Sequence, residues 1–383
     1  MVRAVLLLPL ALVLSVAPEP AEFITDVKPL FNVVTCEGEV LPQLDGKTIA
    51  AYCASQSKRY EHFRTRWAVQ AGKFVGDLVP AELPDEELVY PFGGGDLMAA
   101  LALFPRVKVI TTLSLELAGD PRRLPGLTDA KVLNTSLKAI ANASASTLMS
   151  NDSLSKNLSA TQRGELPGQL SMHLMGLALA NQEPVSVRFF RVEADGSLHY
   201  FTKEEVAAAE GTTADKLKAT WKAPDFSPVF ANVEIQFVPK GQPNAPRRTH
   251  RHIAANLGNG SIPPGLMKHL EAKGRVTMMT KAASYLLWNE SFTQIREYVL
   301  THADFMVSDS TGVPPRYWAQ KGCSVAAYGA FEKSFLGTWD GYQEEMRKLF
   351  ATAKKLPMRF GYPDGSEGKH SHLMTATCLK PKG

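Results

Sequence analysis

Apolar residues recur at helical spacing along several stretches of the chain. Between residues 57 and 78, large apolar side chains such as Phe63, Trp67 and Phe74 are separated by charged ones, which predicts an amphipathic helix. In residues 339–355, Glu344 and Glu345 come early and Lys354 and Lys355 come late, as a helix dipole favours. By the same reasoning we predict further helices over residues 96–104, 167–180, 278–288 and 291–302.

Short apolar or alternating runs predict strands between these helices. The clearest is 232–237, where three apolar residues alternate with three polar ones. The remaining strands are expected at residues 88–92, 107–115, 185–192, 198–201 and 304–307. A helix between strands 88–92 and 107–115 normally makes them parallel, whereas a turn at residues 194–197 indicates a hairpin. We therefore predict an α/β fold with a mixed, mostly parallel sheet and flanking helices.

The first residues are typical of a secretory signal peptide. Arg3 gives a positive start, residues 4–16 form an apolar run of 13, and small residues follow at 15–17. We predict that residues 1–21 are a leader cut at Ala17 or nearby, so that the mature chain is secreted or periplasmic. The run is shorter than the roughly 20 residues that span a bilayer. An uncleaved anchor and a buried N-terminus are the alternatives.

The mature chain, residues 22–383, contains no evident linker. We expect a single domain, with possible lobes 22–181 and 182–383 that meet near Asn181. Residues 134–161, rich in Ser, Asn, Ala and Leu, predict a partly helical insertion. Of the 383 residues, 45% are apolar and 21% charged, and 42 Lys and Arg against 38 Asp and Glu give a net charge of +4. This balance argues against nucleic acid or an anionic membrane as the main partner, and it leaves the oligomeric state open.

Four cysteines occur in a chain that we expect in an oxidising compartment. Four cysteines allow three pairings, and we favour Cys36 with Cys53, because the loop between them is short, which leaves Cys323 with Cys378. The alternative is four buried free thiols. None of the spacings is the close pair of a zinc or redox motif.

Three adjacent glycines, Gly93, Gly94 and Gly95, lie between a predicted strand and a predicted helix and are followed by Asp96. Backbone amides in such a turn can approach a ligand closely. Glu116 ends the next strand 23 positions after Gly93, near the offset of roughly 20 at which Rossmann-type domains place an acid on a ribose. The layout resembles the first unit of dinucleotide enzymes and S-adenosylmethionine methyltransferases, although these glycines are contiguous. The alternative is a tight turn in which Asp96 caps the helix.

A second candidate loop follows the strand at 304–307 and contains Asp309, Ser310 and Gly312. Open α/β sheets collect ligands at the carboxyl ends of their strands, so we expect this loop and the glycine turn to form one small-ligand pocket. The alternative is an Asx turn without a ligand. A hydrolase triad of Ser310 with His302 or His173 lacks a G-x-S-x-G elbow.

Two His-x-His pairs, His250 with His252 and His370 with His372, have a spacing that can bind a metal from a strand. Basic residues flank both pairs and disfavour a cation, so we assign no metal, and the cofactor is unknown.

Four motifs resemble a family of exported bacterial proteins and lipoproteins. They are residues 90–96 (YPFGGGD), 281–287 (KAASYLL), 292–296 and 309–314 (DSTGVP). Members carry Y-P-F-x-G-x-D, K-x-A-S-Y-L and D-D-S-G-I-P in this order, and the match covers roughly residues 85–380. The resemblance implies export and one co-folded unit but no particular reaction. Here Ser308 stands where the family tends to have a second Asp, and no lipobox cysteine follows the leader.

We therefore expect a secreted α/β protein that binds a small ligand at Gly93–Asp96, Glu116 and Asp309–Gly312. Its catalytic residues, if any, are unknown. The alternatives are a Rossmann-like, methyltransferase-like transferase or a hydrolase.

Overall fold

The computed structural model describes residues 19–145, 147–148, 165–213, 227–281, 284–310, 312–331, 341–361 and 371–378. Residues 1–18 of the predicted leader and residues 149–161 of the predicted insertion lie outside this part of the chain. Residue 146 lies outside it as well, and residues 134–145 of the insertion belong to the helix Ala130–Ala145, in agreement with the prediction of partly helical structure.

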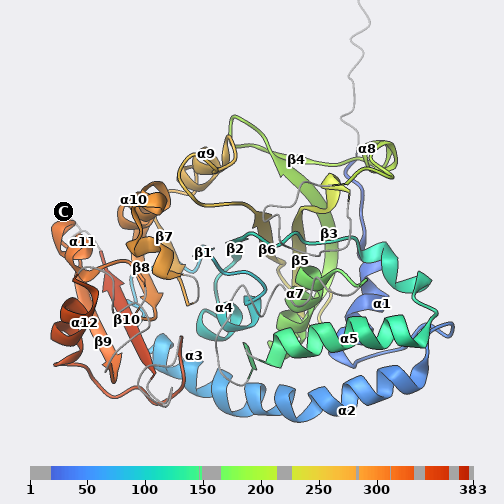
Figure 1. The fold of residues 1–383 in the computed structure, drawn as a ribbon, viewed down its shortest axis with the longest axis horizontal. Coiled ribbons are helices and arrows are strands. Elements are labelled where there is room, and N and C mark those ends of the chain that lie inside the picture. The colour runs from blue at the N-terminus through green and yellow to red at the C-terminus, as the bar shows by residue number, and fades with distance from the viewer. Residues whose placement is uncertain are drawn as a thin grey trace, which may run out of the picture.

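Ten strands of the described chain form one sheet in the order β4-β3-β5-β6-β2-β1-β7-β8-β10-β9 (Figure 1). Their bounds are β1 (Glu87–Pro91), β2 (Val109–Ser114), β3 (Gln182–Val192), β4 (Leu198–Tyr200), β5 (Asn232–Pro239), β6 (Arg248–Ala254), β7 (Val276–Met279), β8 (Ala303–Ser308), β9 (Ser324–Gly329) and β10 (His372–Thr377). The five central strands, β6-β2-β1-β7-β8, are mutually parallel.

The prediction of a mostly parallel sheet is wrong. Among the described strands, five neighbouring pairs are antiparallel and four are parallel. The cause lies at the two ends of the sheet. On one side β3, β4 and β5 form an antiparallel extension beside β6, and on the other β10 runs back between β8 and β9.

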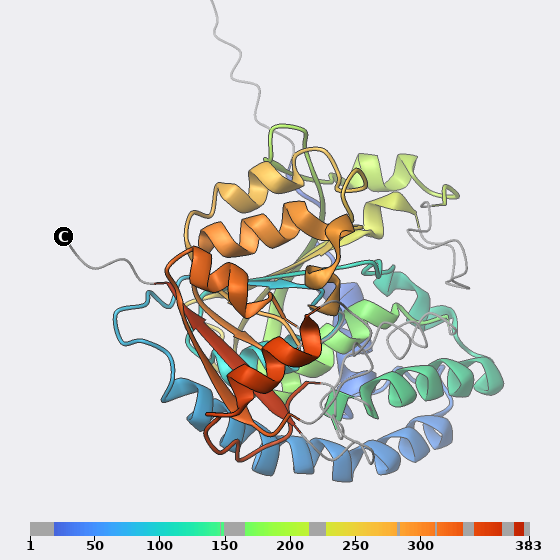
Figure 2. The same cartoon turned by 60° about the vertical axis from the view of Figure 1, so that its left-hand side comes forward.

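Helices cover both faces of the sheet (Figure 2). One apolar core joins α1, α2, α3, α4, α5 and α7 to side chains such as Ile110 and Ile235, and a second joins α9, α10 and α11 to side chains such as Val89 and Leu113. A third, smaller core packs α12 against Ala327 and Met374. The helices are α1 (Ile24–Thr35), α2 (Gly46–His62), α3 (Ala68–Gly76), α4 (Leu97–Leu103), α5 (Ala130–Ala145), α7 (Gly168–Leu179), α8 (Lys203–Ala208), α9 (Leu266–Glu271), α10 (Thr293–His302), α11 (Pro315–Gln320) and α12 (Tyr342–Phe350).

Two helix predictions differ from the structure. The helix expected at 57–78 begins earlier, at Gly46, because the Asp45 carboxylate accepts the backbone N–H of Thr48, and a π-helical turn at Phe63–Trp67 joins α2 to α3. The helix expected at 278–288 is wrong, since its first residues belong to β7. All four residues of β7 are buried. A strand covered on both faces is a continuous apolar run, which periodicity cannot distinguish from a helix.

Both predicted disulfides are confirmed. Cys36 at the end of α1 is bonded to Cys53 in α2, and Cys323 before β9 is bonded to Cys378 after β10. The second bridge therefore closes the antiparallel pair at the edge of the sheet. No helix within the described ranges is long and apolar enough to cross a membrane.

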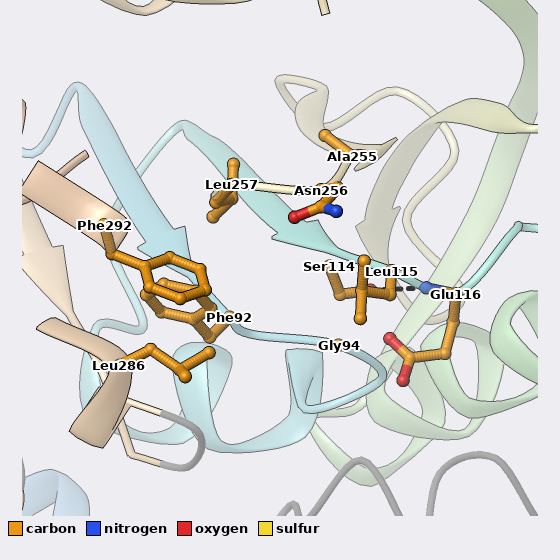
Figure 3. Close-up of a pocket in the computed structure, with 10 residues that line it drawn as sticks. All are labelled: Phe92, Gly94, Ser114, Leu115, Glu116, Ala255, Asn256, Leu257, Leu286 and Phe292. Atoms are coloured by element: carbon orange, nitrogen blue, oxygen red, sulfur yellow. Dashed lines mark hydrogen bonds between the residues drawn. The ribbon is translucent and has the colours of Figure 1, made fainter. Parts of the chain in front are cut away.

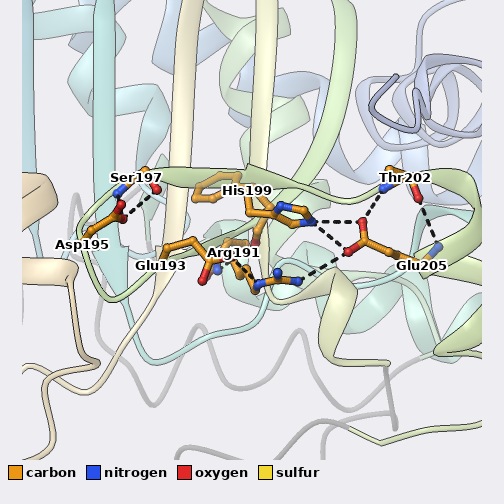
Figure 4. Close-up of polar contacts among 9 residues, drawn as sticks. Arg191, Glu193, Asp195, Ser197, His199, Thr202 and Glu205 are labelled. Carbon is orange, nitrogen blue, oxygen red and sulfur yellow. Dashed lines mark hydrogen bonds and ion pairs between the residues drawn. The ribbon is translucent and has the colours of Figure 1, made fainter. Parts of the chain in front are cut away.

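The predicted hairpin is present as β3 and β4, which pair in antiparallel register. The Asp195 carboxylate accepts the N–H and the hydroxyl of Ser197 in the turn (Figure 4). Beyond β4, Thr202 and Glu205 form a capping box that begins α8, and the His199 ring contacts the carboxylate of Glu205. These polar contacts order an exposed corner of the extension.

Candidate functional site

A pocket of about 70 Å³ opens at the carboxyl end of the parallel strands (Figure 3). Each group of lining residues follows a different strand: β1 leads into Phe92 and Gly94, β2 into Glu116, and β6 into Asn256. The complete lining consists of Phe92, Gly94, Ser114, Leu115, Glu116, Ala255, Asn256, Leu257, Leu286 and Phe292. Loops from neighbouring parallel strands therefore converge on one cavity.

The pocket has an apolar end and a polar end, which lie on opposite sides in Figure 3. At the apolar end, the rings of Phe92 and Phe292 meet edge to face, 6.0 Å apart. At the polar end, the Ser114 hydroxyl accepts the N–H of Glu116 at 3.3 Å. Asn256 Oδ1 accepts the N–H of Gly258 at 3.0 Å, and its Nδ2 can donate to a ligand. The walls suit a flat apolar group that carries a hydrogen-bonding edge.

The glycine turn contributes to this pocket through one of its three glycines. Gly94, with φ of 49°, lines the cavity, and Phe92 has the left-handed φ of 60° that non-glycine residues rarely adopt. Gly93 and Gly95 serve packing. A Cβ on Gly93 would lie 2.7 Å from the Tyr90 ring, and one on Gly95 would lie 2.7 Å from Met172 Cβ in α7. Only hydrogen at these positions permits the close approach.

Asp96 occupies the N-cap position of α4, as the alternative prediction holds, but the main contacts of its carboxylate lie elsewhere. It is fully buried, does not line the pocket, and makes no capping hydrogen bond to α4. Instead its carboxylate forms an ion pair with Lys281, which follows β7 and is itself fully buried, and accepts the hydroxyl of Tyr90 at 3.0 Å. Burial raises the pKa of Asp96, while Lys281 and Tyr90 lower it. The pair ties the turn after β1 to the residue after β7, and these two strands are neighbours in the sheet.

The second predicted loop lies outside this pocket. Asp309 and Ser310 are fully buried, and neither they nor Gly312 belong to the pocket lining. Ser310 lies instead against Tyr342 and His372, with its hydroxyl 3.1 Å from the Tyr342 oxygen. The two loops are thus brought to the same end of the sheet but not into one cavity.

The contacts of Ser310 argue against a nucleophilic role. The backbone N–H of Ser310 donates to His372 Nδ1 at 3.2 Å, so that nitrogen carries no proton. In a neutral ring the proton is then on Nε2, which lies 3.5 Å from the Ser310 hydroxyl and can only donate to it. A general base must accept that proton. His173 and His302, the histidines considered in the sequence, hold other positions in α7 and at the end of α10.

A buried histidine cluster behind the polar end was not anticipated as a unit. His250 and His252 of β6, predicted as a possible metal pair, both contact the Thr112 hydroxyl, at 3.0 and 3.2 Å. His252 Nε2 donates to the Glu116 carbonyl at 2.7 Å, and the ring of His173 in α7 lies 4.3 Å from that of His250. The alternation of β6 predicts that two histidines share a face, but their partners come from β2 and α7.

These contacts fix the protons of the cluster. Since a carbonyl only accepts, His252 carries its proton on Nε2, and its Nδ1 accepts the Thr112 hydroxyl. Thr112 in turn accepts from His250 Nε2, which leaves His250 Nδ1 unprotonated. Burial lowers the pKa of all three histidines, that of His252 to about 4. Within the described ranges, no group of three or more His, Cys, Asp or Glu side chains is arranged to hold a metal; His370 lies outside these ranges.

No protein-family model, curated protein or solved structure matches this chain. The function must therefore be argued from the chain's own residues.

Proposed function

We propose that this chain is an exported protein that binds a small, ring-bearing ligand in the pocket between Phe92, Glu116 and Asn256. The observation that carries the proposal is the position of the pocket. Along the chain, the parallel strands are first added on one side of β1, as β2 and then β6. The later strands β7 and β8 are added on the other side of β1. Ligands of open α/β sheets bind at the carboxyl ends of the strands where the order reverses in this way.

The chemistry of the walls narrows the ligand. Phe92, Phe292 and the leucines of the lining favour an aromatic or aliphatic ring, whereas Glu116 and Asn256 favour hydrogen-bond donors and acceptors along one edge of that ring. A cavity of about 70 Å³ suits one ring better than an entire dinucleotide. The left-handed backbone of Phe92 is the kind of local strain that proteins retain at binding sites.

Export is part of the proposal. It is supported by the leader pattern of residues 1–21 and by two disulfides, which persist in oxidising compartments. Intact-mass analysis of secreted material tests it: we expect an N-terminus between Pro18 and Phe23. Retention of Met1 in secreted protein would contradict cleavage.

We also propose that the chain is related to the exported bacterial proteins that its motifs resemble. Tyr90 and Asp96 of the first motif and Lys281 of the second are in direct contact. This contact supports the idea that the motifs preserve one structural unit beside the pocket. The division into lobes near Asn181 stays a prediction.

The second candidate function is a Rossmann-like transferase. If the parallel strands are numbered in chain order, their arrangement is 3-2-1-4-5, the order of dinucleotide-binding domains. Glu116 follows the second of these strands, where such domains hold a ribose hydroxyl. An antiparallel strand inserted before the last one, as β10 is, also resembles S-adenosylmethionine methyltransferases. Adenosine and S-adenosylmethionine are therefore included among the test compounds.

The test is ligand-observed NMR on the mature protein with single-ring fragments, sugars, adenosine and S-adenosylmethionine. We expect at least one ring compound to bind, and Phe292→Ala to weaken it about tenfold through lost ring contact. Glu61→Gln changes an exposed residue of α2 away from the pocket lining. It controls for effects of mutation and purification, and it should leave the affinity unchanged. Tight binding of S-adenosylmethionine that is lost in Glu116→Gln would favour the transferase. Binding by no compound would refute the proposal.

A further inference from the structure

The pocket lining carries one charge. Among the described residues that line the pocket, Glu116 is the only ionisable one, and the others are glycine, apolar or neutral polar residues. Glu116 is 1% exposed, and in Figure 3 its carboxylate turns toward Gly94 and the middle of the lining. A ligand that enters the pocket therefore meets a negative charge and no positive charge from the lining.

The backbone of Glu116 is fixed on both sides. Its N–H donates to the Ser114 hydroxyl at 3.3 Å, and its carbonyl accepts the His252 Nε2 proton at 2.7 Å. Two residues further along the chain, the N–H of Ala118 donates to the carbonyl of Ala231 at 3.0 Å. The position of this charge is thus preorganised, so that a ligand that binds it orders little of the chain.

The neighbouring polar groups can accept further hydrogen bonds from a ligand. Asn256 Oδ1 and Ser114 Oγ each accept one backbone N–H and have a second lone pair. A carboxylate accepts up to about four hydrogen bonds, so a ligand can bind to Glu116 in addition to the protein. His252, which binds the Glu116 carbonyl, is neutral at neutral pH, because burial lowers its pKa to about 4.

We infer that the ring-bearing ligand of this pocket is a cation, with an ammonium or amidinium group that pairs with Glu116. This inference rests on the proposed function, because the ring of the same ligand would lie against Phe92 and Phe292. A cation compensates the Glu116 charge inside the pocket, where two charges interact more strongly than in water. A neutral ligand excludes water from the carboxylate and adds no opposite charge, and an anionic ligand adds a repulsion.

Matched single-ring probes test the charge preference: benzamidine as the cation, benzamide as the neutral analogue, benzoate as the anion and toluene as the apolar reference. We expect wild-type protein to bind benzamidine about tenfold more tightly than benzamide in ligand-observed NMR titrations, and to bind benzoate most weakly of these three. In Glu116→Gln, which keeps the side-chain shape, benzamidine should bind no more tightly than benzamide, while the affinity for toluene changes less than about twofold. Glu61→Gln removes the same charge from an exposed site on α2 and should leave the preference unchanged.

A second variant carries the test if the melting temperature shows that Glu116→Gln does not fold. Asn256→Asp retains the oxygen that accepts the Gly258 N–H and adds a second negative charge at the polar end. Compared with wild type, it should bind benzamidine more tightly and benzoate more weakly.

The inference and the proposed function fail on different results. Equal wild-type affinity for benzamidine and benzamide would overturn the inference, as would a preference for benzamidine that persists in Glu116→Gln or affinities that Asn256→Asp leaves unchanged. The proposed function survives each of these results, because ring compounds still bind. If neither toluene nor any of the three polar probes binds wild-type protein, the proposed function itself fails.

Discussion

Acid should unfold this protein through its buried histidine cluster. Burial holds the pKa of His173 and His250 well below the usual 6.5 and that of His252 near 4. In the unfolded chain the same side chains titrate near 6.5. Between these limits the unfolded state binds more protons than the folded one, so the free energy of unfolding falls as pH falls from about 6.5 toward 4. Above pH 6.5 the histidines are neutral in both states, so they no longer lower the free energy of unfolding.

The size of the effect follows from these values. At pH 5.0, protonation stabilises the unfolded state by about 2 kcal/mol for each histidine, or about 6 kcal/mol for the cluster. Whole domains are stable by about 5 to 15 kcal/mol. Most carboxylates titrate below pH 5, so they contribute little to the change between pH 7.5 and 5.0. His269, whose pKa burial also lowers to about 4, adds to the same trend.

The measurement is urea unfolding followed by tryptophan fluorescence at pH 7.5, 6.0 and 5.0. Wild-type protein should lose at least about 6 kcal/mol over this range. His173→Phe keeps a ring of similar size and removes one titrating group, so it should lose about 2 kcal/mol less. An equal loss in wild type and variant would refute the reasoning, because the acid sensitivity would then arise elsewhere.

Three further changes test the packing of the fold by urea unfolding at pH 7.5. Lys281→Met leaves a buried carboxylate without its counter-charge and should destabilise by about 3 to 5 kcal/mol; a change below 1 kcal/mol would mean that the pair is not buried in solution. Gly95→Ala forces a methyl group against Met172 and should cost about 1 to 3 kcal/mol, with the cost reduced when Met172 is shortened to Ala. Replacing Cys323 and Cys378 with Ser opens a bridge that spans 55 positions and should cost about 4 kcal/mol; wild-type stability without the bridge would contradict the chain-entropy argument.

Local pattern predicted most elements but not their order in the sheet. The strand-helix-strand unit at β1, α4 and β2 and the β3–β4 hairpin were visible, because each depends on neighbouring residues and a short connection. β6 was not predicted, since its Arg and His residues resemble a basic surface. In the fold His250 and His252 enter the core from one face of the strand, and Arg251, on the opposite face, pairs with the buried Glu234.

The candidate site was predicted in part for the same reason. Gly94 and Glu116 line the pocket, because a turn after one strand and an acid after the next meet at one edge of a parallel pair. The role of Asp96 could not be derived, since its partner Lys281 follows a strand that is distant in sequence.

The five parallel strands at the centre of the sheet come from distant parts of the chain, which affects how the chain folds. β1 and β2 emerge early, but their outer neighbours β7 and β6 lie far along the chain; Thr112 of β2 and its partner His250 of β6 are 138 positions apart. Pairs this distant require large loops to close, which slows folding. The N-terminal third therefore cannot complete its sheet while the rest of the chain is still being synthesised. A polypeptide that crosses a membrane before folding gains from this delay, because it stays extended until its last strands arrive.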